Sequence, residues 1–391
     1  MDVNIAILIS SLTGGGAERV SQIVGDYYFE KGENVYYFLM DMSMKQDYDV
    51  KGHIIHTGIK SSSENVLYGD IEVLGRLLKS SWEMRKWKKK YKIDIAISFL
   101  EEPNYLNILS KGKEKVITRV CTILSKWGEM KGLLHNKHFI HLLYSLSDTV
   151  VVIGNYGMYD MHKTYGISRK KIQRIPNPAI QRPKTEDVWV YGNKAVICIG
   201  RLDSVKQQDR IIRAFSYVKM KHKEAKLLIL GDGPMKAYLE KLCIRYQLRD
   251  SVIFIGFTQN VSFYFGHSKV FVMASKVEGF PNSMVEAMAC GVPVVAADCP
   301  GECREILGKK YNNHCNGEIE YCTYGILTPA ITGRVMISSE LTKEELLLGT
   351  ALERVIEDRE LYEKYRERSL KRASKYNMEM VMGLWDKIVT K

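Results

Sequence analysis

Short apolar runs alternate along the chain with longer stretches that are more polar and amphipathic. Each run has the length of a buried strand, and each intervening stretch is long enough for a helix. This alternation predicts a parallel sheet with helices on both faces. In the first half of the chain, the expected strands are residues 3–9, 35–40, 93–99, 115–118 and 149–153.

A polar segment with three prolines interrupts this pattern at residues 175–187 and is typical of a linker. The pattern then restarts. The sequence therefore predicts an N-terminal α/β domain over 1–175, a linker over 176–187 and a second α/β domain over 188–375. A helix at 376–391 has an apolar face that could pack back onto the first domain. Strands of the second domain are expected at 195–200, 226–230, 252–255, 270–274 and 293–297.

The chain of 391 residues carries a net charge of +12, which favours anionic partners. Residues 76–92 concentrate this charge around Trp82 and Trp87. Such a helix lies well on an anionic membrane, where Trp82, Arg85, Lys86, Trp87 and Lys88 would make the contact. A solvated basic face with the tryptophans in the core is an equal alternative. Because no nucleic-acid-binding motif accompanies the charge, nucleic acid is not expected as a partner.

Residues 1–10 do not have the pattern of a secretory signal, and no apolar run approaches the roughly 18–20 residues that span a bilayer. We therefore expect a soluble or peripheral protein. Four of the eight cysteines, Cys299, Cys303, Cys315 and Cys322, cluster in sequence near His314. They are either zinc ligands or reduced cytosolic thiols, and the absence of a CxxC pair favours thiols.

The carboxyl ends of parallel strands are where open α/β sheets bind ligands. After the first strand comes a glycine loop that contains Gly14 and Gly16 and leads into a helix. Such a loop lets backbone N–H groups approach a phosphate or a sugar. A dinucleotide fingerprint, which Asp41 would complete, is the alternative, but Arg19 stands where its third glycine belongs. A glycine-rich turn without a ligand is the third possibility.

Two cations follow the first strand of the second domain. Arg201 can bind two phosphate oxygens at once and Lys206 adds a point charge, so together they suit a diphosphate. Gly231 and Gly233 end the next strand, in either a ligand loop or a tight turn.

Residues 278–291 carry the strongest signal. Pro281 keeps Glu278 on a loop, and a helix is expected to start near Asn282 or Ser283, where free N–H groups attract a phosphate. Glu286 could reach a ribose. Alternatively, Ser283 and Glu286 form a capping box, in which Glu286 only satisfies backbone donors.

Four segments together resemble the GT-B glycosyltransferases of family 4: GGGAER at 14–19, GRLDSVKQQD at 200–209, GDG at 231–233 and EGFPNSMVEAMACGVPVVA at 278–296. The resemblance implies two Rossmann-like domains that face a cleft, with a nucleotide sugar, expected to be a UDP-sugar, mainly on the second domain. The residues it assigns to the donor are Gly15, Gly16, Arg201, Lys206, Gly231, Phe257, Thr258, Glu278, Gly279, Phe280, Pro281, Asn282, Ser283 and Glu286.

By the same resemblance, Arg201 and Lys206 hold the diphosphate, Glu286 holds the ribose, and Glu278 contacts the donor sugar near the reacting carbon. Phe257 and Thr258 border the base. The family retains anomeric configuration and needs no metal or cofactor, and the leaving phosphate helps to deprotonate the acceptor. Glu278, Arg201 and Lys206 would be the catalytic residues of a hexosyltransferase.

The resemblance narrows further to bacterial capsular and cell-wall enzymes through REIL at 304–307 and YGIL at 324–327. The basic segment around Trp82 and Trp87 suggests a lipid-linked acceptor at the cytoplasmic face of the membrane, and a polysaccharide acceptor is the other expectation. Many relatives carry a histidine in the loop that here reads RVCTILSK at 119–126. Arg119 or Thr122 would have to replace it. A nucleotide-sugar 2-epimerase of the same fold and a catalytically weak binding partner of another transferase are the competing hypotheses.

Overall fold

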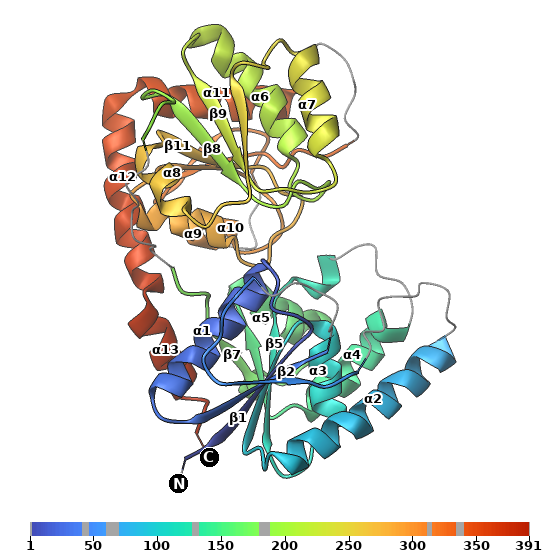
Figure 1. The fold of residues 1–391 in the computed structure, drawn as a ribbon. Coiled ribbons are helices and arrows are strands. Elements are labelled where there is room, and N and C mark those ends of the chain that lie inside the picture. Colours follow the sequence, from blue (N-terminus) through green and yellow to red (C-terminus); the bar gives the residue numbers. More distant parts are fainter. Residues whose placement is uncertain are drawn as a thin grey trace. The chain divides into compact units, whose positions relative to one another are not determined.

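The computed structural model describes residues 2–40, 47–59, 70–126, 133–179, 188–310, 315–333 and 340–390. The chain divides into two compact units. Unit 1 comprises Met1–Asn177 and Glu379–Lys391, and unit 2 comprises Pro178–Met378. Each unit has a largely parallel sheet covered by helices on both faces, which confirms the predicted fold class (Figure 1). Most of the predicted linker, residues 180–187, lies outside the described residues.

The sheet of unit 1 has the strand order β3-β2-β1-β4-β5-β6-β7, and all its neighbouring strands are parallel. The five predicted strands are present within two residues at either end. The sequence did not predict β3 and β7, which are short edge strands with few buried side chains. The strands are β1 (Asn4–Ile9), β2 (Asn34–Leu39), β3 (His53–His56), β4 (Ile95–Phe99), β5 (Lys115–Val120), β6 (Thr149–Val152) and β7 (Ile172–Arg174).

Alternate residues of these strands face two separate cores. Ile5 and Ile7 join the core under α1 and α13, while Ala6 and Leu8 join the core under α2, α3 and α4 (Figure 1). The helices of unit 1 are α1 (Gly16–Glu30), α2 (Asp70–Lys90), α3 (Glu101–Leu109), α4 (Lys137–Leu146), α5 (Asn155–Tyr159) and α13 (Met378–Asp386), with short turns at Leu124–Lys126, Leu133–His135, Asp160–Thr164 and Arg169–Lys171.

The C-terminal helix α13 is part of unit 1. Its Trp385 is fully buried against Phe99 at the end of β4. Asp386 accepts a hydrogen bond from the hydroxyl of Tyr27 at 2.8 Å and pairs with Lys31 at the same distance, so α13 is tied to α1. The apolar face that the sequence shows at 378–389 therefore serves the core of the first domain.

The sheet of unit 2 has the order β10-β9-β8-β11-β12-β14-β13, in which only the edge strand β13 is antiparallel. All five strands predicted for this half are present, and the sequence missed the short β13 and β14. The strands are β8 (Ala195–Ile199), β9 (Lys226–Leu230), β10 (Val252–Gly256), β11 (Val270–Met273), β12 (Val294–Ala297), β13 (Glu320–Tyr321) and β14 (Ile326–Thr328).

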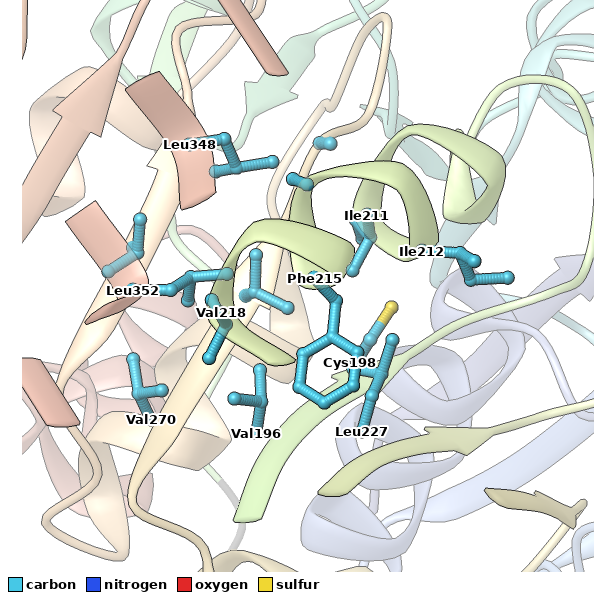
Figure 2. Close-up of a cluster of buried hydrophobic side chains, with 14 of the residues drawn as sticks. Val196, Cys198, Ile211, Ile212, Phe215, Val218, Leu227, Val270, Leu348 and Leu352 are labelled. Carbon is cyan, nitrogen blue, oxygen red and sulfur yellow. The ribbon is translucent and has the colours of Figure 1, made fainter. Parts of the chain in front are cut away.

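Helices α6 and α11 cover one face of this sheet. Phe215 and Val218 of α6 pack on Val196 of β8, and Leu348 and Leu352 of α11 complete the core (Figure 2). The helices of unit 2 are α6 (Gln208–Lys221), α7 (Lys236–Arg245), α8 (Val261–His267), α9 (Asn282–Ala289), α10 (Cys303–Ile306), α11 (Lys343–Glu357) and α12 (Arg359–Ala373), followed by a turn at Ser374–Tyr376.

A buried ion cluster also joins α6 to α11. Arg210 Nη1 and Arg213 Nε each lie 2.8 Å from Glu345 Oε1, and all three side chains are fully buried. Burial would raise the pKa of Glu345, but hydrogen bonds from the two arginines outweigh it and the pKa is lowered. The cluster therefore holds α11 against α6 and has a structural role.

Candidate functional site

The loops that carry the predicted donor motifs of unit 2 leave the same edge of its sheet. Strand β8 lies between β9 and β11, and the chain reverses its direction of growth there, which defines the topological switch point of the sheet. The segment 200–207 follows β8, the segment 231–235 follows β9, and the segment 274–281 follows β11. The strand order therefore brings together three motifs that are far apart in the sequence.

Glu278 and Lys206 meet at this edge. Lys206 Nζ lies 2.6 Å from Glu278 Oε1, and the hydroxyl of Ser275 donates to the same oxygen at 2.6 Å. Burial alone would lower the pKa of Lys206, but the Glu278 carboxylate outweighs this effect and the pKa is raised. Lys206 is therefore a cation at neutral pH. The motif did not reveal Ser275, whose only signal is its place at the end of a strand three residues before Glu278.

The backbone of Glu278 is held by a glycine that the sequence did not single out. Glu278 and Gly301 form a parallel β-bridge, and the N–H of Glu278 donates to the carbonyl of Pro300 at 3.1 Å. Gly301 has a φ of +132°, and a Cβ there would stand 1.6 Å from the carbonyl oxygen of Glu278. Only glycine permits this approach, so the 298–302 loop after β12 positions the candidate catalytic glutamate.

Asp203 organises the loop that presents the two cations. Its Oδ2 accepts a hydrogen bond from Arg201 Nε at 2.6 Å, and its Oδ1 accepts from the backbone N–H groups of Val205 and Lys206. The Arg201 side chain is still 73% exposed. Although burial would raise the pKa of Asp203, the hydrogen bond from Arg201 leads the effects that lower it. Asp203 lies within the segment GRLDSVKQQD, but the sequence alone does not indicate this role.

The GDG turn packs directly on the loop after β8. A Cβ at Gly231 would lie 2.2 Å from the carbonyl oxygen of Gly200, and one at Gly233 would lie 2.5 Å from that of Leu202. The N–H of Leu202 also donates to the carbonyl of Asp232 at 2.9 Å. Close backbone packing therefore accounts for both glycines, as the tight-turn alternative expects. Whether Gly231 also contacts a ligand stays a prediction.

Helix α9 begins at Asn282, as predicted, and its N-cap residue is Pro281, which makes no side-chain capping bond. The capping-box alternative for Ser283 and Glu286 is therefore wrong. Glu286 lies in the second turn and is partly exposed. Phe280 and Pro281 are buried, and the Phe280 ring packs edge-on against Tyr376, so these two residues shape the loop. Gly279, Asn282 and Ser283 are partly exposed beside them.

Phe257 follows β10 and is 62% exposed, while Thr258 accepts a hydrogen bond from the N–H of Asn260 at 3.1 Å. An exposed aromatic ring at the carboxyl end of a strand is a suitable surface for stacking a base. The base-binding role of Phe257 and Thr258 stays a prediction.

The glycine loop of unit 1 ends in α1, with Gly15 in front of the helix and Gly16 as its first residue. The Glu18 side chain folds back over this loop, and a Cβ at Gly15 would lie 2.0 Å from Glu18 Oε2. Burial raises the pKa of Glu18. A carboxylate in this position acts against any phosphate at this loop, whether it belongs to a dinucleotide or to the donor. The donor role of Gly15 and Gly16 stays a prediction. Asp41, the acidic residue of that alternative, lies outside the described residues.

The two tryptophans of the basic helix α2 differ in exposure, so one fits the membrane-contact alternative and the other fits the core alternative. Trp87 is partly buried, stacks on Tyr91 and packs against the core of unit 1. Trp82 is 60% exposed, and the ammonium of Lys86 lies 3.2 Å from the centroid of its ring. Arg85 is exposed as well.

The prediction that Lys88 contacts a membrane is wrong. Its side chain is buried, and Nζ lies 2.9 Å from Glu114 Oε1 and 2.7 Å from Asn107 Oδ1. Burial lowers the pKa of Lys88 to about 8.

The placement of Arg119 on the acceptor side is also wrong. This side chain is fully buried, and its Nη2 donates to the carbonyl of Ile175 and to Asn177 Oδ1. Its guanidinium lies 5.4 Å from the ring centroid of Trp385. Because these groups enclose the guanidinium, Arg119 fixes the end of unit 1 and does not replace the family histidine.

Two of the four clustered cysteines come close together: Cys299 Sγ and Cys303 Sγ are 3.4 Å apart and buried. The pKa of Cys303 is raised well above its usual value, first by the hydrogen bond with Cys299 and then by burial. Within the described ranges, the only trio of potential metal ligands that converges is His222, Glu353 and Glu357, away from these cysteines. His314 lies outside them.

Among the helices of the described residues, none is long and apolar enough to cross a bilayer. Two α/β units with the motif set of unit 2 define a GT-B glycosyltransferase. The family model described as glycosyl transferases group 1 matches residues 184–319. The chain is 30% identical over 317 residues to the N-acetylgalactosamine-N,N'-diacetylbacillosaminyl-diphospho-undecaprenol 4-alpha-N-acetylgalactosaminyltransferase of Campylobacter jejuni, covering 78% of this chain and 83% of that enzyme. The chain belongs to this glycosyltransferase family and takes a nucleotide-sugar donor.

A second relative, the poly(glycerol-phosphate) alpha-glucosyltransferase of Bacillus subtilis, is 25% identical over 316 residues, which cover 76% of this chain and 42% of that enzyme. Solved structures share the fold. The complex of Anabaena HepE with UDP and glucose superposes with a TM-score of 0.70 at 17% identity, covering 98% of this chain and 97% of HepE. Staphylococcus aureus TarM, crystallised with UDP, has a TM-score of 0.73 at 13% identity, with both chains fully covered.

Proposed function

We propose that the chain is a retaining, metal-independent hexosyltransferase that moves a sugar from a UDP-sugar to a lipid-linked acceptor at the cytoplasmic face of the membrane. One observation carries the donor half of this proposal. Glu278 is held by Lys206 and Ser275 beside the start of α9, in the part of unit 2 where Arg201 is exposed. This arrangement combines cations for a diphosphate with a carboxylate for sugar hydroxyls.

The chemistry follows from the charges. Lys206 has three N–H donors, of which one goes to Glu278, so the others remain for the diphosphate. Arg201 is oriented by Asp203 through Nε, which leaves its terminal N–H groups for phosphate oxygens. As the bond between the sugar and the diphosphate breaks, negative charge grows on the departing oxygen, and the two cations and the N-terminus of α9 stabilise it.

The acceptor half of the proposal rests on the printed function of the Campylobacter jejuni relative, which adds N-acetylgalactosamine to a sugar on diphospho-undecaprenol. In this chain, Trp82 and Leu78 of α2 and Leu142 and Leu146 of α4 are exposed apolar side chains. Both helices cover the same face of the unit 1 sheet (Figure 1). With the lysines of α2, they make a basic and apolar surface suited to anionic lipid.

Product analysis tests the donor and the mechanism. The purified chain is incubated with a UDP-sugar and an octyl glycoside as acceptor, with and without EDTA, and the released UDP and the anomeric configuration of the new glycosidic bond are measured. Retention of configuration, net release of UDP and insensitivity to EDTA are expected. Conversion of the donor sugar without net release of UDP would favour the epimerase, and binding without either reaction would favour a non-catalytic partner.

Liposome co-sedimentation tests the membrane part separately. Binding should increase with the fraction of anionic lipid and should fall for Trp82→Ala. The matched control is Tyr321→Ala, which removes an exposed aromatic ring from unit 2. Binding that ignores both lipid charge and Trp82 would overturn this part.

A further inference from the structure

The sheet of unit 1 has its own switch point, between β1 and β4. From β1 the chain first adds β2 and β3 on one side and then β4 to β7 on the other, so the loops after β1 and β4 separate at their carboxyl ends. The loop after β1 contains the glycines at 14–16. The segment after β4 contains Leu100 and Glu101, neither of which the sequence motifs single out.

Leu100 has a φ of +74°. The left-handed region is unfavourable for a residue with a branched side chain, and residues held there are concentrated at functional sites. The turn at Leu100 leads directly from β4 into the first residue of α3, which is Glu101. The strained residue therefore sets where the Glu101 carboxylate stands.

Glu101 is only partly exposed, and Thr122 of the loop after β5 donates a hydrogen bond to its Oε1 at 3.1 Å. Among the described residues, no lysine, arginine or histidine forms an ion pair with it. The buried carboxylates of Glu114 and Glu345, by contrast, pair with Lys88 and Arg210. Burial raises the pKa of Glu101. Within the described ranges, the one side chain that donates to Glu101 is that of Thr122, so the carboxylate can accept a further hydrogen bond.

A structural role is the alternative, because an acidic residue in the first turn stabilises the start of a helix. Glu102 occupies the same turn of α3 and provides the same charge. Glu101 differs from Glu102 in its contact with Thr122, and both Glu101 and Glu18 act electrostatically on the Cys121 thiol. Both carboxylates belong to segments that follow neighbouring strands, β1 and β4, and a carboxylate oxygen can accept a hydrogen bond from a hydroxyl group.

We propose that Glu101, positioned by Leu100 and Thr122, binds a hydroxyl group of the acceptor sugar. The inference rests on the proposed transferase function and assigns a neutral sugar ring to unit 1 as its ligand. In a lipid-diphosphate-linked acceptor, it is the terminal sugar and not the diphosphate that reaches Glu101. Glu101 and Thr122 then provide the acceptor-side contact that the sequence analysis expects of Arg119 or Thr122.

The test compares Glu101→Gln with Glu102→Gln, a neighbouring change of the same size and charge. The acceptors are octyl glycosides, including octyl N-acetyl-α-D-galactosaminide and octyl glucoside, and the donor is a UDP-sugar. For Glu101→Gln, the acceptor KM should rise roughly 10- to 100-fold, because a hydrogen bond to a charged group is lost. The Kd for UDP should stay within about twofold, as should both constants of Glu102→Gln.

Two further measurements separate binding from a structural effect. Thr122→Ser should keep the acceptor KM, whereas Thr122→Val should raise it, because only serine retains the hydroxyl. In the wild type, acceptor affinity should fall as the pH drops through the raised pKa of Glu101, which lies above that of an ordinary glutamate. This dependence should be absent in Glu101→Gln, where the side chain does not titrate.

Each outcome decides a different point. An unchanged acceptor KM in Glu101→Gln would overturn the proposal, and a parallel loss of UDP binding would place Glu101 on the donor instead. A wild type that binds UDP but neither binds nor glycosylates any octyl glycoside would also overturn it. A wild type that binds no nucleotide would contradict the proposed function itself, and this would be evident before any variant is compared.

Discussion

The contact between Gly301 and Glu278 gives a sharp prediction for the substitution Gly301→Ala. The added Cβ would stand 1.6 Å from the carbonyl oxygen of Glu278, whereas an ordinary contact begins at 3.4 Å. The backbone at Glu278 must therefore move by about 1.8 Å, the difference between these two distances. The carboxylate moves with it, away from Lys206 Nζ and Ser275 Oγ, which now hold it at 2.6 Å each.

The size of the effect follows from this displacement. Misplacing a reacting group by 1 Å costs on the order of 10²-fold in rate, so kcat should fall by about 100-fold or more. The φ of +132° adds backbone strain of about 1–3 kcal/mol. In a unit of this size, that strain lowers the unfolding midpoint by only about 2–12 °C. Loss of activity should therefore exceed what loss of folded protein explains.

The assay measures donor turnover and thermal unfolding of the wild type, Gly301→Ala and the control Gly192→Ala. Gly192 also has a positive φ, +73°, but nothing lies within 4 Å of a Cβ placed there. The control thus carries the strain without the collision and should keep nearly full activity. If Gly301→Ala kept wild-type kcat, the β-bridge would not position Glu278 and the account of this loop would be refuted.

Three other predictions concern the hydrogen bond to Glu278 and the stability of each unit. Ser275→Ala removes a hydrogen bond to the charged Glu278, so kcat should fall by roughly 10-fold with a small change in the unfolding midpoint. Glu345→Gln leaves two buried arginines without a carboxylate, and urea unfolding should show a loss of about 3–5 kcal/mol. The pKa of Glu345 is lowered in the folded state. Its contribution to stability is therefore fully present above the unfolded-state pKa and is lost as the pH falls through the folded-state pKa. Urea titrations at several pH values would measure this loss. Trp385→Ala should cost unit 1 about 3–5 kcal/mol in the same assay, and an unchanged midpoint would show that α13 does not stabilise this unit.

The sequence predicts most of the fold because buried parallel strands leave continuous apolar runs. Every long central strand was placed to within two residues. Three of the missed strands, β3, β7 and β13, lie at sheet edges, where side chains are exposed and the hydrophobic pattern is weak. The fourth, β14, is buried between β12 and β13, but its three residues are too few to form a pattern. Edge strands are defined by their hydrogen-bond partners, and a single sequence does not show these.

For the candidate site, the sequence supplied the residues with distinctive local motifs but not their supports. Ser275 and Gly301 act on Glu278 through contacts that exist only once β11 and β12 are paired. Glu101 has no motif at all, and its signals are a strained neighbour and, within the described residues, the absence of an ion-pair partner. The errors at Lys88 and Arg119 have one cause. Cationic side chains are mostly exposed in folded proteins, but this fold encloses these two with specific acceptors.

The central claim is that Arg201 and Lys206 hold the diphosphate of a nucleotide sugar. Its most direct test is a titration of UDP-, GDP- and ADP-sugars, with NAD as control, into the wild type, Arg201→Ala and Lys206→Met. We expect one nucleotide-sugar class, the UDP-sugars, to bind the wild type, and each variant to bind it about 10- to 100-fold more weakly because a charged hydrogen bond is lost. Undiminished binding in both variants, or binding of NAD alone, would contradict the claim.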